Sequence, residues 1–205
     1  MRASVLRKCI AVLVGVFIFG GAALAVDVNA RDADGLTALM RAARDNSDPK
    51  ELEALIQGGA DVKARDDKGW TALMMAASAN PNPEVLTTLI NAGAGPEVLR
   101  SNVNERTEDG LTPLMVAAGN NPNSAVLATL LNAGAGVNER DETDRTALMF
   151  AAWNNPNSEV ITTLLQSGAN PELKDKLGKR AIDYAQENEK LKNTDVLQQL
   201  NDASR

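Results

Sequence analysis

The sequence contains no histidine and only one cysteine, Cys9, in 205 residues. Catalytic triads and thiol proteases depend on an imidazole base, and the common zinc sites are built from histidine and cysteine, so these sites are excluded. The glycines are spread along the chain, which argues against a glycine-rich phosphate-binding loop. We therefore predict no catalytic residue, no metal site and no cofactor, and we expect a protein that is not an enzyme.

Aromatic residues are also scarce. They make up 3% of the chain, whereas hydrophobic residues of all kinds make up 44%. A single globular core usually contains more large rings, but helices that stack through alanine and leucine do not need them. The composition therefore favours an all-α array of helices.

No acidic residue precedes Asp27. The charged residues before it are basic, namely Arg2, Arg7 and Lys8. An uncharged stretch over 9–26 ends with Ala23-Leu24-Ala25, and this order is typical of a secretory signal peptide. We expect residues 1–25 to be a signal that is cleaved after Ala25, with export to the periplasm or the exterior. The alternative is a retained membrane anchor, because the uncharged stretch is close to the minimum length that spans a bilayer.

The chain is acidic, with 21 basic and 27 acidic residues and a net charge of −6. Cleavage of the signal removes three basic residues and no acidic one, which changes the net charge to −9. Nucleic acids and anionic membrane surfaces are poor partners for such a chain. The charge either keeps the protein soluble or attracts a basic protein partner, and the sequence leaves both possibilities open.

A four-residue motif recurs along the chain, first as Thr37-Ala38-Leu39-Met40. Its later copies are at 71–74, 112–115 and 146–149, with a degenerate copy at 180–183. The steps between copies are 34, 41, 34 and 34 residues. A second motif, a small residue followed by Gly-Ala, keeps this spacing at 58–60, 92–94, 133–135 and 167–169. Two motifs with one spacing indicate repeated structural units, and the longer step indicates seven inserted residues.

Each unit is predicted to contain two helices. A threonine hydroxyl can cap the first helix, an Asn-Pro pair ends it, and the next asparagine can cap the second helix. These residues are Thr37, Thr71, Thr112 and Thr146; the pairs at 80–81, 121–122 and 155–156; and Asn82, Asn123 and Asn157. The second helix has leucine and isoleucine on one face. No unit this small can bury such a face alone, so the units must stack as a solenoid.

These motifs resemble the ankyrin repeat, whose units begin with Thr-Pro-Leu-His and continue through a second helix and Gly-Ala to a β-turn finger. The resemblance covers about 26–202, although methionine stands at 40, 74, 115 and 149, where the family usually has histidine. It implies an all-α ankyrin-repeat solenoid of stacked helix-turn-helix units with short β-turn fingers. The predicted organisation is a signal (1–25), a partial finger (26–31) and an ankyrin-repeat domain (32–205). Its units are 32–65, 66–106 with an insertion at 96–102, 107–140, 141–174 and a C-terminal cap at 175–205.

Ankyrin arrays, as a family, bind proteins through their finger tips and the exposed side of their first helices. The resemblance therefore implies an exported protein-protein interaction module that holds an unidentified partner protein on its concave face. The alternative is an inhibitor or immunity-type protein that blocks a partner enzyme. We expect a monomer that binds neither nucleic acid nor, once the signal is cleaved, a membrane.

The family's contact positions, carried over to this chain, select six partner-binding residues. They are Trp70, Met75, Arg145, Phe150, Trp153 and Tyr184. All four aromatic residues that follow the signal belong to this set, and aromatic residues and arginine are the usual anchors of interfaces. The alternative is that neighbouring first helices cover these rings, which would then belong to the core.

Each finger also carries a cation next to a turn residue. The pairs are Arg31-Asp32, Arg65-Asp66, Arg106-Thr107, Arg140-Asp141 and Lys174-Asp175. Either these cations form a binding surface or the pairs brace the stacked fingers. Asp144 stands where the other units have a turn glycine, and because aspartate tolerates a left-handed backbone, we expect the same turn there.

Overall fold

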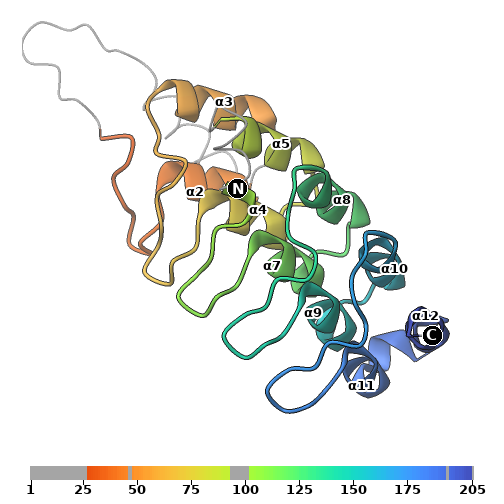
Figure 1. Cartoon of the computed structure of the whole chain (residues 1–205). Helices are drawn as coiled ribbons and strands as arrows, with labels where there is room; N and C mark the ends of the chain where they lie inside the picture. Colours follow the sequence, from red (N-terminus) through yellow and green to blue (C-terminus); the bar gives the residue numbers. More distant parts are fainter. Residues whose placement is uncertain (1–26, 46–47, 93–101, 193, 205) are drawn as a thin grey trace, which may run out of the picture.

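The helices lie in two rows, and turns that form fingers project from one side of the array, in the computed structural model shown in Figure 1. The structure describes residues 27–45, 48–92, 102–192 and 194–204. The first helices of the units are α2 (Ala38–Asp45), α4 (Ala72–Ala79), α7 (Pro113–Asn120), α9 (Ala147–Asn154) and α11 (Ala181–Glu187). The second helices are α3 (Pro49–Gln57), α5 (Pro83–Asn91), α8 (Ser124–Asn132), α10 (Ser158–Gln166) and α12 (Val196–Ala203). A 3₁₀ helix, η1 (Glu189–Leu191), connects α11 to α12.

Each first helix packs against the next first helix, and each second helix packs against the next second helix. The ten α-helices named above and the lack of any strand in the part of the chain given above confirm the predicted all-α solenoid. None of these helices is both long and apolar enough to cross a membrane. The predicted signal peptide and all of the predicted insertion except Asn102 lie outside the described residues.

The predicted helix caps are present in the structure. The hydroxyls of Thr37, Thr71, Thr112 and Thr146 each accept from the backbone N–H three residues later, at 3.3–3.4 Å. The side chains of Asp48, Asn82, Asn123 and Asn157 accept from the second residue of the second helices. The fifth unit lacks the threonine, and there the Asp183 carboxylate accepts from the Arg180 N–H at 2.7 Å. Every first helix thus starts directly after a capping residue.

The core between the two rows is made of small and flexible side chains. Met40, Met74, Met115 and Met149, which stand where the family has histidine, are at most 1% exposed. Full burial of a methionine contributes about 1.5–3 kcal/mol. The alanine pairs at 42–43, 76–77, 117–118 and 151–152 are also buried, which lets adjacent first helices approach closely. The scarcity of large rings is therefore compatible with a continuous core.

Four buried asparagines, which we call the asparagine ladder, connect each unit to the one before it. They are Asn80, Asn121, Asn155 and Asn188. Their Nδ2 groups donate to carbonyls of the preceding unit: those of Ala43, Ala77, Ala118 and Ala152, at 2.8–3.0 Å. Their Oδ1 atoms accept from the N–H two residues later. The sequence predicted the first three only as helix ends, whereas their side chains join the units.

The turns of the fingers have a left-handed backbone at one position. The φ angles of Gly35, Gly69, Gly110 and Gly178 are 77–78°, and that of Asp144 is 64°. The left-handed turn expected at Asp144 is therefore confirmed. The carboxylates of Asp32, Asp66, Asp141 and Asp175 accept backbone N–H groups two and four residues later, so they hold the turns closed.

Candidate partner-binding site

An aromatic hollow lies between the first helices of the third and fourth units. Its volume is about 350 Å³, and we call it the aromatic groove. Its lining residues are Trp70 and Leu111 at the finger bases, Met115, Val116, Gly119 and Asn120 on α7, and Phe150, Trp153 and Asn154 on α9. The groove therefore brings together three of the six predicted residues, Trp70, Phe150 and Trp153. None of its lining residues carries a charge.

Local sequence explains why the groove opens at this place. The residues that correspond in the four complete units are Arg44, Ser78, Gly119 and Trp153, so the third unit has no side chain where the fourth has an indole. A Cβ atom added to Gly119 would lie 3.6 Å from the Phe150 Cβ, which is ordinary van der Waals contact. Because Gly119 has no side chain, a space remains at this position, and the rings of Phe150 and Trp153 on α9 border it.

Trp153 is the most exposed member of the groove. Its exposed fraction is 52%, and among the described residues only Leu177, at the fifth finger tip, is another exposed large hydrophobic residue. Trp70 and Phe150 are half-buried and pack against the core. A large apolar side chain exposed in a concave site usually marks a contact with a partner.

Arg145 is held over the rings of α9. Its guanidinium carbon lies 4.7 Å from the centre of the Phe150 ring and 5.8 Å from that of Trp153. Its Nη2 lies 2.9 Å from the Asp141 Oδ2, so its charge is paired. Burial raises the pKa of Asp141, but hydrogen bonds from Arg145 and Thr143 outweigh burial and lower it. This carboxylate therefore stays ionised and fixes Arg145 in place.

Tyr184 and Met75, the remaining two predicted residues, are each 9% exposed. The Tyr184 ring lies 6.4 Å from that of Trp153, at an angle of 48°, and its hydroxyl donates to the buried Asp175. Burial and this hydrogen bond raise the pKa of Tyr184 to about 12. Met75 belongs to the core and does not line the groove. Tyr184 can hold the Trp153 ring in place through the contact between their rings. Met75 exposes little surface that a partner could contact.

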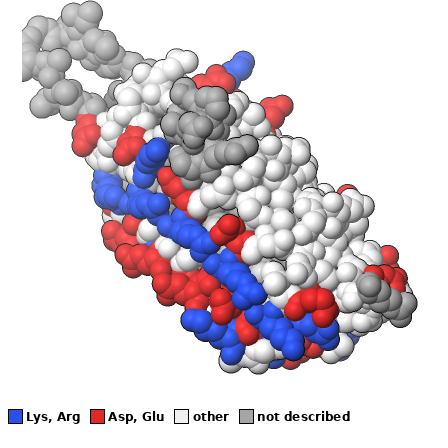
Figure 2. Space-filling view, in the orientation of Figure 1, with Lys and Arg blue, Asp and Glu red and all other residues white. Residues whose placement is uncertain are grey.

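The finger cations form a second ladder, which we call the arginine ladder. Arg65 Nη1 donates to the carbonyls of Gly69 and Arg106, at 2.9 and 2.8 Å. Arg106 Nη1 donates likewise to the carbonyls of Gly110 and Arg140, at 3.2 and 2.7 Å. Arg31 and Arg140 continue the row, and Figure 2 shows a basic stripe that crosses the fingers. These guanidinium groups join adjacent fingers, which favours the bracing interpretation of the pairs.

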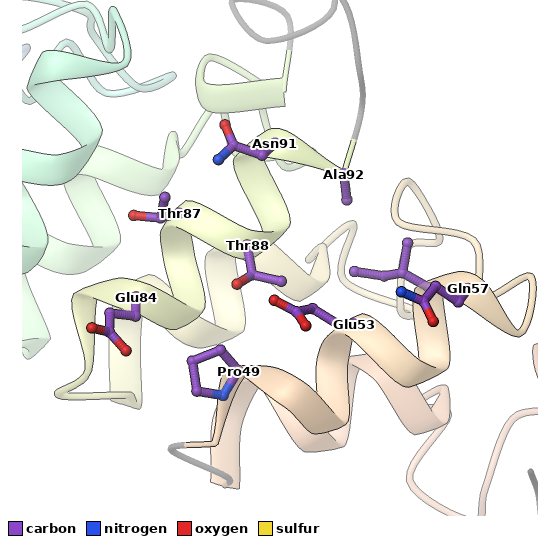
Figure 3. A pocket seen from close by; sticks show the side chains of 9 residues that line it. Pro49, Glu53, Gln57, Glu84, Thr87, Thr88, Asn91 and Ala92 are labelled. Atoms are coloured by element: carbon purple, nitrogen blue, oxygen red, sulfur yellow. The ribbon is translucent and has the colours of Figure 1, made fainter.

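A larger hollow, of about 520 Å³, lies between the second helices α3 and α5 (Figure 3). It is lined by Pro49, Glu53, Ile56, Gln57, Glu84, Thr87, Thr88, Asn91 and Ala92. It contains no aromatic residue and no arginine, which are the usual anchors of an interface. The described part of the chain also has no group of three acidic side chains, cysteines or histidines that could hold a metal. The smaller aromatic groove is therefore the better candidate.

A comparison with protein families agrees with this geometry. A family model described as ankyrin repeats, in three copies, matches residues 5–100 and 97–175. The chain belongs to the ankyrin-repeat family. Ankyrin repeats are generally protein-protein interaction modules, and ankyrin-repeat proteins are typically scaffolds without enzymatic activity. No curated protein matches this ankyrin-repeat chain in a sequence search.

Proposed function

We propose that the protein is an exported interaction module that holds a partner protein in the aromatic groove. The fold supports a binding role, because the stacked units present one continuous face of first helices and fingers. The residues that we assign to the partner are Trp70, Phe150, Trp153 and Arg145, with Tyr184 as the support of Trp153. We also propose that the mature chain is a monomer without catalytic activity and without a nucleic-acid or membrane partner.

The observation that carries this proposal is the exposed Trp153 with a positioned guanidinium next to it. Trp153 keeps half of its surface in solvent, although it touches Tyr184 and lies beside Arg145. Burial of an aromatic side chain in an interface is a common source of binding energy, and arginine and tryptophan are enriched among the residues that contribute most. Because Arg145 is already ordered by Asp141, little side-chain entropy is lost when a partner binds.

The test is affinity capture from the exported fraction, with the wild type and with the double variant Phe150→Ala, Trp153→Ala. Gln166→Ala, at the exposed end of α10, is the matched control. We expect the wild type and the control to retain the same protein and the double variant to lose it at unchanged helical content. Equal capture by the double variant would contradict the proposed site.

Tryptophan fluorescence gives an independent measure of the same site. The chain has two tryptophans, and both line the groove. Binding in the groove should therefore shift the emission of the captured complex relative to the free protein. An unchanged spectrum in a stable complex would place the partner on another surface.

An inhibitor or immunity-type role is the alternative form of this proposal. Both forms use the same face, and they differ in what happens to the partner. If the captured partner is an enzyme, its activity in the complex decides between them: inhibition supports the inhibitor role, and full activity supports the scaffold.

Export can be tested separately. The basic start and the Ala23-Leu24-Ala25 end of the apolar stretch support a cleaved signal peptide. We expect the protein from the exported fraction to begin at Val26, which intact mass measurement and N-terminal sequencing would show. A chain that retains residues 1–25 and sediments with membranes would instead support an anchor.

A further inference from the structure

We propose that the partner segment that enters the aromatic groove is basic, with lysine or arginine residues beside the apolar side chain that it inserts. This inference rests on the proposed function and specifies the partner's chemistry.

The fingers form one wall of the groove, and their tips are close to it. Trp70, Leu111 and Arg145 lie at the bases of the second, third and fourth fingers. In each finger, the residue four positions earlier donates its N–H to the carbonyl of this base residue, at 2.9–3.0 Å, and so closes the finger. The tips are at most three residues away along the chain, a span of at most about 11 Å. The charges of these tips therefore lie near any occupant of the groove.

Four carboxylates occupy the exposed tip positions of these fingers. They belong to Asp67, Glu108, Asp109 and Glu142. The ion pairs of the described residues include none of the four, and Lys68 is the single cation at the same positions. Figure 2 shows acidic side chains along the fingers, beside the basic stripe.

The nearby arginines are already paired within the protein. Arg65, Arg106 and Arg140 bind backbone carbonyls and have Glu105, Glu139 and Asp144 as ion-pair partners. Arg145 is paired with the buried Asp141. Lys190 also lies at the groove, where its ammonium donates to the Asn154 carbonyl at 3.1 Å. The four tip carboxylates outnumber the two cations without an ion pair, Lys68 and Lys190, so the net charge next to the groove is negative.

The polar atoms of the groove point to the same kind of partner. Asn120 and Asn154 donate through Nδ2 to the Ser78 hydroxyl and the Gly119 carbonyl, at 3.2 and 3.0 Å. Each amide oxygen is then left to accept from a donor, such as a lysine ammonium or an arginine guanidinium of the partner. At physiological ionic strength the screening length is about 8 Å, so the tip carboxylates attract a basic segment and repel an acidic one.

The test uses two synthetic peptides, acetyl-Lys-Lys-Gly-Leu-Phe-Gly-Lys-Lys-amide and its counterpart with glutamate in place of lysine. Their affinities are measured from the fluorescence of Trp153 in a Trp70→Phe background, at low and at high salt. The tip variant is Asp67→Asn, Glu108→Gln, Asp109→Asn, Glu142→Gln. The control makes the same change of net charge on the second helices and η1, with Glu53→Gln, Glu84→Gln, Glu159→Gln and Glu189→Gln.

We expect the lysine peptide to bind at least tenfold more tightly than the glutamate peptide. The tip variant should lose about tenfold in affinity for the lysine peptide together with most of the salt dependence, and the control should lose less than about twofold. Equal binding of both peptides, or equal loss in the tip variant and the control, would overturn the inference.

A third set of measurements separates this inference from the proposed function. The groove variant Phe150→Ala in the same background keeps Trp153 as the reporter. If both peptides bind equally and both are weakened by Phe150→Ala, the groove binds but does not select basic segments, so only this inference fails. If neither peptide changes the fluorescence of Trp153, the groove binds neither of them and this inference fails. The proposed function is then decided by the affinity capture alone.

Discussion

Replacement of Asn121 by alanine tests whether the asparagine ladder holds the units together. Asn121 is 1% exposed, and its Nδ2 donates to the carbonyls of Ala77 and Asn80 in the preceding unit, at 3.0 and 2.9 Å. Its Oδ1 accepts from the Asn123 N–H at 3.0 Å. The variant removes all three hydrogen bonds and leaves two buried carbonyls and one partly buried N–H without their partner. At about 1 kcal/mol for each lost partner, the free energy of unfolding should fall by about 3 kcal/mol.

The loss should also change how the array unfolds. A repeat protein is stabilised by interfaces between neighbouring units, and Asn121 belongs to the interface between the second and third. Trp70 and Trp153 are on opposite sides of it. In the Asn121→Ala background, the single-tryptophan variants Trp153→Phe and Trp70→Phe should therefore unfold in urea at different midpoints, whereas without Asn121→Ala they should unfold together.

Asn120→Ala is the matched control, because Asn120 is the exposed neighbour and donates one hydrogen bond, to the Ser78 hydroxyl. Its substitution should change the free energy of unfolding by no more than about 0.5 kcal/mol. The comparison is made by urea unfolding followed by circular dichroism and by fluorescence. A loss in Asn121→Ala as small as that in Asn120→Ala would refute the reasoning, since the buried amide would then contribute nothing beyond an exposed one.

Two further predictions concern the fingers and the fifth unit. Tyr184→Phe should lower the free energy of unfolding at neutral pH by about 1.5 kcal/mol, because a hydrogen bond to the Asp175 carboxylate is lost. Burial raises the pKa of Asp175, but the hydrogen bonds from Tyr184 and from backbone N–H groups lower it by more. Stability from a lowered carboxyl pKa is present above the unfolded value, about 3.9, and is lost as the pH falls through the folded value. The difference between wild type and variant in urea unfolding should therefore shrink below about pH 4, and a difference that does not depend on pH would contradict this account. Gly110→Ala should cost about 2 kcal/mol, because φ is 78° and the new Cβ would lie 3.0 Å from the Glu142 nitrogen. Gly59→Ala, at a φ of 91° with no atom within 4 Å, should cost only about 1 kcal/mol, and equal melting temperatures would show that the contact is relieved without cost.

The helices, their caps and their order could be predicted because these features depend on neighbouring residues. The hydroxyl of Thr112 reaches the Met115 N–H within one turn, and Asn123 caps a helix that starts at the next residue. The left-handed turn at Asp144 is equally local. The recurrence of the motif in steps of 34 or 41 residues then predicts the stacking, since each unit must bury its apolar face against a similar neighbour.

The cross-unit bonds could not be predicted in the same way. Asn121 and Arg106 bond to carbonyls of other units, and which carbonyl lies opposite depends on the register and twist of the stack. The sequence shows an asparagine before proline and an arginine before threonine, and both patterns are common in solvent-exposed turns. The burial of Tyr184 could not be predicted either, because it results from the packing of the last unit.

Both ladders have their acceptors on the main chain, and this makes the units interchangeable. Every residue type has a backbone carbonyl. The asparagine and arginine side chains of a unit inserted into the middle of the array would therefore have hydrogen-bond acceptors, whatever the neighbouring side chains are. Duplication of an internal block of 34 residues could thus lengthen the protein in one genetic step. The surface residues of the new copy would then be free to diverge toward another target.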